Sequence, residues 1–420
     1  MNSLNKKLYD INPNNNQQYQ SYLFISSLLI IIGILLSTVL FSSISAVENT
    51  PKQIDANSLS EFTPKPANTT ETIDAKAFDR LMQSSLEEPQ SKKSNSINNL
   101  MTTSSPHSQS LSNYKTATKY EFVKKWGSKG TGDGQFQRVH DLDFDPTEKY
   151  LYTIDRDGNR VQVFDKNGNF IKKWGSKGTG DGQFTVPYSV DVDSKGDVWV
   201  ADRGNHRIQK FDKDGNFIFK FGSFGSKEGQ FDNPRQVAVD KDLKYLYVVD
   251  SKNNRIQKFD TKGNFIKSWG TLGSGDGQFS LPVTVIIDSK GDIIVNDRGT
   301  NRVQKSDPDG NFLLKFGSTG TSNSQFAEVE HMATDKYNNI YVNDPQLGDN
   351  GSGQPSVKKF DTNGNFITKF GSLGKGDGQF TDPEHLAIDS DGNVYVSDRK
   401  ANTISVFKPV YFSIQASKLR

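Results

Sequence analysis

One unit is repeated six times along this chain of 420 residues. The tripeptide Gly-Gln-Phe, or a near match, ends at Phe136, Phe184, Phe231, Phe279, Phe326 and Phe380, and the intervals are 48, 47, 48, 47 and 54 residues. Each copy contains four short apolar runs separated by Gly, Asp and Asn, which predicts four antiparallel strands joined by tight turns. A sheet this small exposes apolar side chains on both faces, and stacking six sheets around a ring buries them. The repeat therefore predicts an all-β fold, a six-bladed β-propeller.

Three motifs of the repeat resemble those of NHL repeats. In the second copy, residues 182–184 read Gly-Gln-Phe, residues 202–211 read Asp-Arg-Gly-Asn-His-Arg-Ile-Gln-Lys-Phe and residues 214–217 read Asp-Gly-Asn-Phe. The resemblance implies an NHL-type propeller that extends from Tyr120 to about Pro409. It says much less about function, because one fold supports many activities.

The first 118 residues differ in composition from the repeats. Residues 1–21 are a short polar tail, and residues 22–41 are an almost unbroken apolar run without charge. About 20 helical residues span a bilayer core of ~30 Å, so residues 22–46 are expected to be a transmembrane signal-anchor or a cleaved signal peptide. Residues 47–118 are rich in Ser, Thr and Asn, which predicts a disordered stalk before the propeller at residues 119–420.

The charges that flank the apolar run predict where the propeller is located. Lys6 and Lys7 precede the run and Glu48 comes after it, which favours a cytoplasmic N-terminus and a propeller outside the cell membrane. We therefore expect a single-pass membrane protein that contacts the bilayer through residues 22–41, or a secreted protein if residues 1–46 are removed.

Two further features concern how the ring closes and what protrudes from it. Residues 122–128 resemble the outermost strand of the next copy at residues 170–176, so the strand at residues 119–126 is expected to complete the sixth blade, with residues 411–416 as the alternative. Pro409 is expected to separate the last three strands from the C-terminal residues beyond it, because proline cannot donate to a ladder. The fifth copy carries an insertion at residues 345–355, which is expected on the surface as a ligand-binding loop or as a neutral solvated loop.

Composition and context exclude several functions. Lys and Arg total 51 against 49 for Asp and Glu, so no bulk basic charge indicates a nucleic-acid partner, although some NHL domains bind RNA. The chain has no Cys, so it contains neither disulfides nor the RING zinc sites of ubiquitin ligases. The Gly-rich turns precede strands rather than helices, which argues against a nucleotide site, and the Asp-x-Asp-Gly segments lack the glutamate of a calcium loop. Asp and Arg recur in nearly every copy and are expected to form hairpin and inter-blade ion pairs.

The informative positions vary among the copies and lie just before the first strand, which lines the central channel in propellers. In chain order the pairs are His140-Asp141, Tyr188-Ser189, Arg235-Gln236, Val283-Thr284, Glu330-His331 and Glu384-His385. Blades five, six and one are neighbours in the ring. Three of the five histidines therefore converge on one sector of one mouth, together with carboxylates of the same pairs.

The leading interpretation is a binding scaffold without chemistry of its own. A protein, peptide or glycan ligand would contact the insertion and the mouth residues Tyr188, Arg235, Glu330, His331, Glu384 and His385.

The alternative is a divalent-metal lyase or hydrolase. Imidazole and carboxylate groups suit a cation such as Zn²⁺ or Ca²⁺, so His140, His331 and His385 would be metal ligands and Glu330 or Glu384 the catalytic base. The arrangement resembles that of peptidyl-hydroxyglycine amidating lyases, whose metal histidines stand in a Phe-x-x-Pro-His-x-Leu setting, whereas the sixth copy reads Phe-Thr-Asp-Pro-Glu-His-Leu. His140 keeps the family's offset, but His331 and His385 stand one place later. Since successive strand residues face opposite ways, that shift could aim two imidazoles away from the channel.

Overall fold

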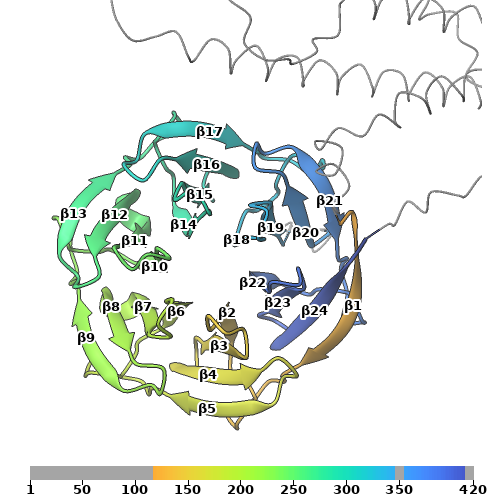
Figure 1. Cartoon of the computed structure of the whole chain (residues 1–420), viewed down its shortest axis with the longest axis horizontal. Coiled ribbons are helices and arrows are strands. Elements are labelled where there is room, and N and C mark those ends of the chain that lie inside the picture. The colour runs from red at the N-terminus through yellow and green to blue at the C-terminus, as the bar shows by residue number, and fades with distance from the viewer. Residues whose placement is uncertain (1–116, 346–353, 412–420) are drawn as a thin grey trace, which may run out of the picture. The chain divides into compact units, whose positions relative to one another are not determined.

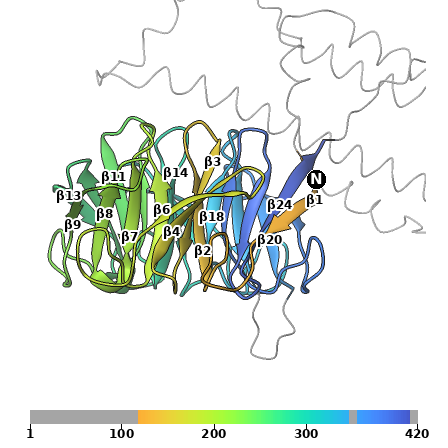
Figure 2. The same cartoon turned by 90° about the horizontal axis from the view of Figure 1, so that it is seen from below.

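The computed structural model describes residues 117–345 and 354–411, and it confirms the six-bladed propeller. Six antiparallel sheets of four strands each stand around a central channel (Figure 1), and Figure 2 shows the ring from the side. The predicted tail, the predicted membrane segment or signal peptide and the stalk up to residue 116 lie outside the described residues, as does most of the insertion. Within the described ranges, no helix combines the length and hydropathy that a membrane span requires.

Each blade runs from an inner strand beside the channel to an outer strand at the rim. Blade one consists of β2 (Val139–Phe144), β3 (Tyr150–Asp155), β4 (Arg160–Asp165) and β5 (Phe170–Trp174). Blade two consists of β6 (Pro187–Val192), β7 (Val198–Asp202), the 3-10 turn η3 (Arg203–Asn205), β8 (Arg207–Phe211) and β9 (Phe217–Phe221). Blade three consists of β10 (Pro234–Val239), β11 (Tyr245–Asp250), the 3-10 turn η4 (Ser251–Asn253), β12 (Arg255–Asp260) and β13 (Phe265–Trp269).

The second half of the ring has the same plan. Blade four consists of β14 (Pro282–Ile287), β15 (Ile293–Asp297), β16 (Arg302–Ser306) and β17 (Phe312–Phe316). Blade five consists of β18 (Met332–Thr334), β19 (Ile340–Asp344), β20 (Ser356–Phe360) and β21 (Phe366–Phe370). Blade six consists of β22 (Pro383–Ile388), β23 (Val394–Asp398), β24 (Thr403–Val410) and β1 (Lys119–Trp126).

The hydrophobic core lies between neighbouring blades. One of its clusters joins Trp199 and Ile208 of blade two to Val248 of blade three, and each of the other clusters likewise combines two adjacent blades. The phenylalanine that ends each Gly-Gln-Phe motif is at most 2% exposed. Phe231, for example, packs against Gly222, where an added Cβ would come within 2.4 Å of the ring. The repeated motif is therefore mainly a packing motif.

Buried ion pairs hold the hairpins. In blade two, Arg207 Nε donates to Asp202 Oδ2 at 2.8 Å, and the carboxylate is fully buried. Equivalent pairs are Asp155–Arg160, Asp250–Arg255 and Asp297–Arg302. The guanidinium of Arg207 also donates to the main-chain carbonyls of Thr179 and Gly180, at 2.7 and 2.8 Å. The predicted hairpin ion pairs are confirmed, and their arginines also fix the Gly-rich turn that leads into the blade.

The ring closes by pairing its two ends. β1 lies against β24 as the outer strand of blade six, as predicted for residues 119–126. The expectation that Pro409 marks a break after the last three strands is wrong, because β24 continues to Val410. The ladder between β24 and β23 ends at Phe407, so Pro409 pairs only with Tyr120 of β1. Because β23 does not pair with Pro409, the missing N–H of the proline removes no hydrogen bond between β24 and β23. Most of the alternative closing segment lies outside the described residues.

Candidate functional site

A β-bulge near the start of the inner strands decides where their side chains point. In blade one, Val139 pairs with Asp155 and Leu142 pairs with Thr153, so β2 advances three residues while β3 advances two. The same irregularity occurs in β6, β10, β14 and β22. A bulge interrupts the alternation of side chains along a strand. Both residues of a pair such as His140-Asp141 can therefore face the channel.

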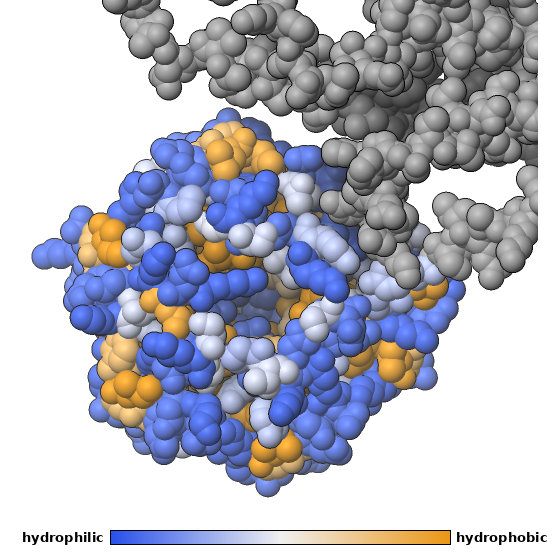
Figure 3. All heavy atoms as spheres, viewed as in Figure 1, coloured by the Kyte–Doolittle hydropathy of each residue, from blue (hydrophilic) through white to orange (hydrophobic). Residues whose placement is uncertain are grey.

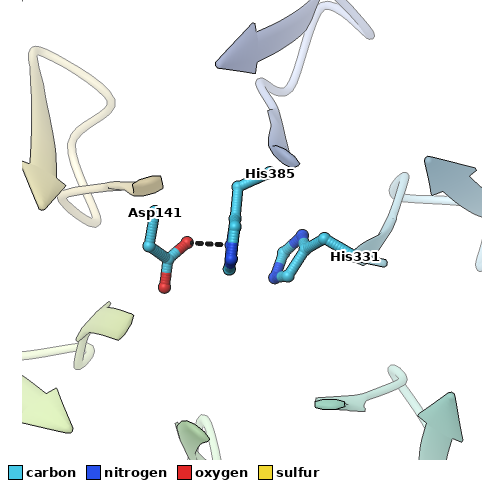
Figure 4. A group of neighbouring side chains, drawn as sticks. All are labelled: Asp141, His331 and His385. Atoms are coloured by element: carbon cyan, nitrogen blue, oxygen red, sulfur yellow. Dashed lines mark ion pairs between the residues drawn. The ribbon is translucent and has the colours of Figure 1, made fainter. Parts of the chain in front are cut away.

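Asp141, His331 and His385 form one buried group. Figure 4 shows their side chains pointing toward one another from blades one, five and six. His385 Nδ1 lies 2.7 Å from Asp141 Oδ1, and the rings of His331 and His385 have centroids 3.8 Å apart. One possible ligand atom from each residue lies within 4.8 Å of the other two. The prediction that the register shift could turn these two imidazoles away from the channel is wrong, because His331 lines the channel cavity and the His385 ring lies against the His331 ring.

Main-chain donors fix the carboxylate of this group. The N–H groups of Leu142 and Val190 donate to the two oxygens of Asp141 at 2.7 and 2.9 Å. Val190 belongs to the inner strand of blade two, so the carboxylate also links two blades. Gln236 of blade three lies on the other side of the group, with its Nε2 3.2 Å from Nε2 of His331. All six of the mouth pairs thus occupy positions around a single channel.

His140 and Glu384 form a second pair beside this group. His140 Nε2 lies 3.0 Å from Glu384 Oε1, and Arg399 Nη1 lies 2.9 Å from Glu384 Oε2. The His140 ring also packs against the rings of His385 and Tyr188, with centroids 4.6 and 3.9 Å apart. Of the three predicted metal ligands, two therefore stand with Asp141, whereas His140 is paired with Glu384.

Glu330, the other predicted base, is held on the opposite flank. It is 2% exposed, and Arg298 Nη2 lies 3.1 Å from its Oε1. Burial and the nearby charge of Glu384 raise the pKa of Glu330 to about 7. Burial alone would also raise the pKa of Glu384, but His140 and Arg399 hold it below its usual value. Of the two predicted bases, Glu330 is therefore the one that titrates near neutrality, as a general base requires.

Burial keeps the three imidazoles neutral. It lowers the pKa of His140 to about 4 and that of His385 to about 3, and the pKa of His331 falls well below its usual value for the same reason. Burial also raises the pKa of Asp141 to about 6, so this carboxyl group is still mostly ionised at pH 7. Neutral imidazole and carboxylate are the forms that bind a divalent cation.

Tyr188 and Arg235, the remaining predicted ligand-binding residues, lie on the side of blades two and three. They are 6% and 8% exposed, and the guanidinium carbon of Arg235 is 5.3 Å from the centroid of the Tyr188 ring. Arg156 and Arg203 also stand over this ring, although the sequence pattern did not indicate that they lie at the mouth. Each hairpin of blades one, two and four has two arginines but one aspartate at the end of the second strand, so the sequence shows an excess of arginine without showing which of them lack a partner.

The channel also opens toward the other end of the ring. Figure 3 shows a hollow at the centre of that face, and the cavity is lined by the inner strands of all six blades. Asp141 and His331 contribute to its wall. The buried group is therefore reached from this cavity.

Comparisons with known proteins agree with this architecture. The NHL repeat model matches residues 184–211, 231–259 and 380–407, and no curated protein matches the chain. A crystal structure of a structural genomics protein of unknown function from Bacteroides thetaiotaomicron is 20% identical, with a TM-score of 0.54 over 69% of this chain and 76% of that chain.

A second solved structure, that of a streptogramin B lyase, is 11% identical, with a TM-score of 0.50 over 70% of this chain and all of the other. At these identities the likeness concerns the fold alone. The three matched repeats and the six blades together identify the chain as an NHL-repeat six-bladed β-propeller.

Proposed function

We propose that the propeller is a binding scaffold that receives a peptide, a glycan or a segment of another protein at the mouth of its channel. The observation that carries this proposal is a set of buried side-chain nitrogen atoms without hydrogen-bond partners, which includes His140 Nδ1 and Arg235 Nη1. Buried polar groups in proteins are nearly always paired. A bound ligand would supply the missing partners.

The test is a screen of the purified full-length chain against peptide and glycan arrays. Binding at the mouth should be lost in Tyr188→Ala and kept in Phe224→Ala, which removes an aromatic side chain that is 67% exposed. The absence of binding on every array, or binding that depends on Phe224 and not on Tyr188, would rule out the mouth as the binding site.

We further propose that this scaffold is tethered to the outside of a cell membrane. The apolar run at residues 22–41 and its flanking charges support this location. In intact cells, an antibody against a C-terminal epitope tag should stain without permeabilisation. The protein should fractionate with membranes, and release into the medium would instead indicate cleavage of the N-terminal segment.

A second candidate function, a divalent-metal lyase or hydrolase, is supported by the group of Asp141, His331 and His385. Two imidazoles and one carboxylate match the three-ligand sites that catalytic zinc uses, whereas calcium prefers six to eight oxygen ligands. The donor set therefore fits zinc better than calcium. Such an ion would act as a Lewis acid toward a bound substrate, and Glu330 would accept the proton.

Metal analysis separates the two candidates. After incubation with zinc and removal of excess, the enzyme hypothesis predicts near-stoichiometric zinc that is lost in His385→Ala and in Asp141→Asn. His206→Ala is the matched control, because His206 lies in the η3 hairpin and faces Phe224 and Asp232 rather than the group. Wild-type protein that retains no zinc, or equal zinc in all variants, would remove this candidate.

A further inference from the structure

Three arginines from three consecutive blades stand over the ring of Tyr188, and a fourth arginine lies near two of them. The guanidinium carbons of Arg156, Arg203 and Arg235 lie 5.6, 5.0 and 5.3 Å from the centroid of its ring. Arg138 is close enough to Arg156 and Arg203 for its charge to lower the pKa of both. We call these four residues the arginine arc.

Within the described part of the chain, no carboxylate forms an ion pair with the arginine arc, and the negative charges that act on it from further away include those of Glu330 on Arg235 and of Glu384 on Arg156. Among the described residues, Arg138 Nε, Arg156 Nε, Arg203 Nε and Arg235 Nη1 are buried without a hydrogen-bond partner. Arg235 is only 8% exposed. A buried cation without a counter-ion is costly in free energy. A bound anion would therefore be stabilised by the arc.

The corresponding arginines in the other half of the mouth have carboxylate partners. Arg298 of blade four is paired with Glu328 and Glu330, and Arg399 of blade six is paired with Glu384 and Asp382. Arg156, Arg203, Arg298 and Arg399 occupy equivalent positions, one residue after the last aspartate of the second strand. The same arginine position is thus neutralised by carboxylates on blades four and six and left without them on blades one and two.

Burial lowers the pKa values of Arg156 and Arg203, and the neighbouring arginines lower them further. Both effects would be relieved by an anion placed among the four guanidinium groups. Guanidinium binds carboxylate, sulfate and phosphate oxygens through two parallel N–H donors, and the fork geometry suits these oxyanions better than a halide. The ring of Tyr188 forms the base of this site, since three of the guanidinium groups lie over it.

We propose that the arginine arc binds an oxyanion, which is a carboxylate, sulfate or phosphate group of the ligand that the mouth receives. The proposal rests on the proposed binding function and narrows its ligand to one that carries such a group. Because the ring of His140 contacts both Tyr188 and His385, the oxyanion would be bound beside the group of Asp141, His331 and His385. The anionic end would thereby orient the rest of the ligand toward that group.

The test measures the thermal stability of the full-length chain while sodium acetate, sodium sulfate or sodium phosphate is titrated at constant ionic strength, with sodium chloride as the reference. At least one oxyanion should raise the melting temperature saturably above the chloride reference, as ligands that bind only the folded state do. The oxyanion with the lowest half-saturation concentration indicates which group the natural ligand carries.

Two variants and one control make the outcome specific. Arg203→Gln and Arg235→Gln should weaken the apparent affinity at least tenfold. Arg235→Gln should also melt at the same or a higher temperature than wild type without oxyanion, because it removes a buried charge that has no ion-pair partner among the described residues. Lys252→Gln removes one positive charge from an exposed side chain at the hairpin of blade three and should leave the titration unchanged.

Three outcomes would overturn the proposal. These are no saturable rise over chloride, an equal rise in wild type and both arginine variants, or a loss of stability in Arg235→Gln in oxyanion-free buffer. Array ligands that depend on Tyr188, without any oxyanion effect, would leave the proposed binding function intact and reject only the arc. An oxyanion effect without array ligands would reject only the larger ligand.

Discussion

At the scale of single residues, blade five has a buried lysine–aspartate pair where blades one to four have an arginine–aspartate pair. Ser356 stands where the hairpins of blades one to four have arginine, and Lys358 stands where they have glutamine. Lys358 Nζ lies 2.7 Å from Asp344 Oδ2, and both side chains are fully buried. Lys358 also donates to the main-chain carbonyls of Ser322 and Gln325. One lysine therefore performs the contacts that an arginine and a glutamine share elsewhere.

The first prediction concerns this lysine. Lys358→Met should lower the free energy of unfolding by about 3–5 kcal/mol, because it takes the cation from a buried carboxylate. The measurement is urea unfolding monitored by tryptophan fluorescence. The double variant Ser356→Arg with Lys358→Gln, which copies blades one to four, should recover most of the loss. Equal stability of Lys358→Met and wild type would show that the pair contributes nothing.

At the scale of structural elements, the turns between the third and fourth strands hold neighbouring blades together. Gly215 adopts φ of +88°, and an added Cβ would lie 2.7 Å from the indole of Trp174 in the previous blade. Gly229, in the loop before blade three, adopts φ of +73°, and an added Cβ would meet nothing within 4 Å. Alanine substitution of both glycines therefore separates two costs. Backbone strain affects both positions, whereas a packing clash affects only Gly215.

We predict that Gly229→Ala lowers the free energy of unfolding by about 1–2 kcal/mol, the cost of a left-handed alanine. Gly215→Ala should cost about 1–3 kcal/mol more, because the methyl group must also displace the indole. Equilibrium unfolding of both variants tests this order. Equal losses of unfolding free energy in the two variants would show that the turn at Gly215 does not pack tightly against the neighbouring blade.

The same turns predict how stability depends on pH. Asp212 accepts hydrogen bonds from the main-chain N–H groups of Asp214 and Asn216 and from the Asn216 side chain. These bonds lower the pKa of Asp212, and the equivalent bonds from Asn311 lower that of Asp307. Because the folded-state pKa lies below the unfolded value, the stabilisation is complete above the unfolded pKa and is lost as pH falls through the folded pKa.

We therefore expect the melting temperature to fall as the pH decreases from about 5 to 2. The double variant Asp212→Asn with Asp307→Asn should be less stable than wild type at pH 7, and the difference should shrink at pH 2. A constant difference over this range would mean that ionisation of the two carboxyl groups is irrelevant to the turns.

The elements also show how far the sequence could predict the site. The strands and turns could be predicted from the alternation and the Asp-Gly-Asn turns, and the blade count from the repeat period. The bulge could not be foreseen, because the residues inside it range from His140-Asp141 to Val283-Thr284 and share no property. Without the bulge, the alternation rule points Asp141, His331 and His385 to one side of the strands and His140 to the other, so it predicts that only one of these sets faces the channel.

The arginine arc was missed for a related reason. Arg156 and Arg203 belong to the repeated hairpin motif, and a residue that recurs in most blades is expected to be structural. The structure shows that one arginine of each hairpin, such as Arg207, is structural, whereas the one directly after the aspartate faces the mouth. Only the three-dimensional comparison of blades reveals that carboxylates accompany it at Arg298 and Arg399 and are missing at the arc.

At the scale of the whole molecule, stability depends on joining strands from opposite ends of the described propeller. Glu121 of β1 and Lys408 of β24 are register partners, and their charged atoms lie 3.7 Å apart. Opposite residues on antiparallel strands have Cα separations of about 4.5–5.5 Å, which is within the range that a disulfide bridges. The chain has no cysteine of its own, so an introduced pair would be free of competing thiols.

We predict that the variant Glu121→Cys with Lys408→Cys forms an intramolecular disulfide and, when oxidised, unfolds with a free energy about 2–4 kcal/mol higher than when reduced. The bridge closes a loop that contains almost the entire propeller, so it restricts the unfolded chain far more than the folded ring. Urea unfolding with and without reductant measures the difference, and Glu121→Ser with Lys408→Ser controls for the lost ion pair. If β1 did not close the ring, the thiols would remain free or would form dimers, and the reductant would not change stability.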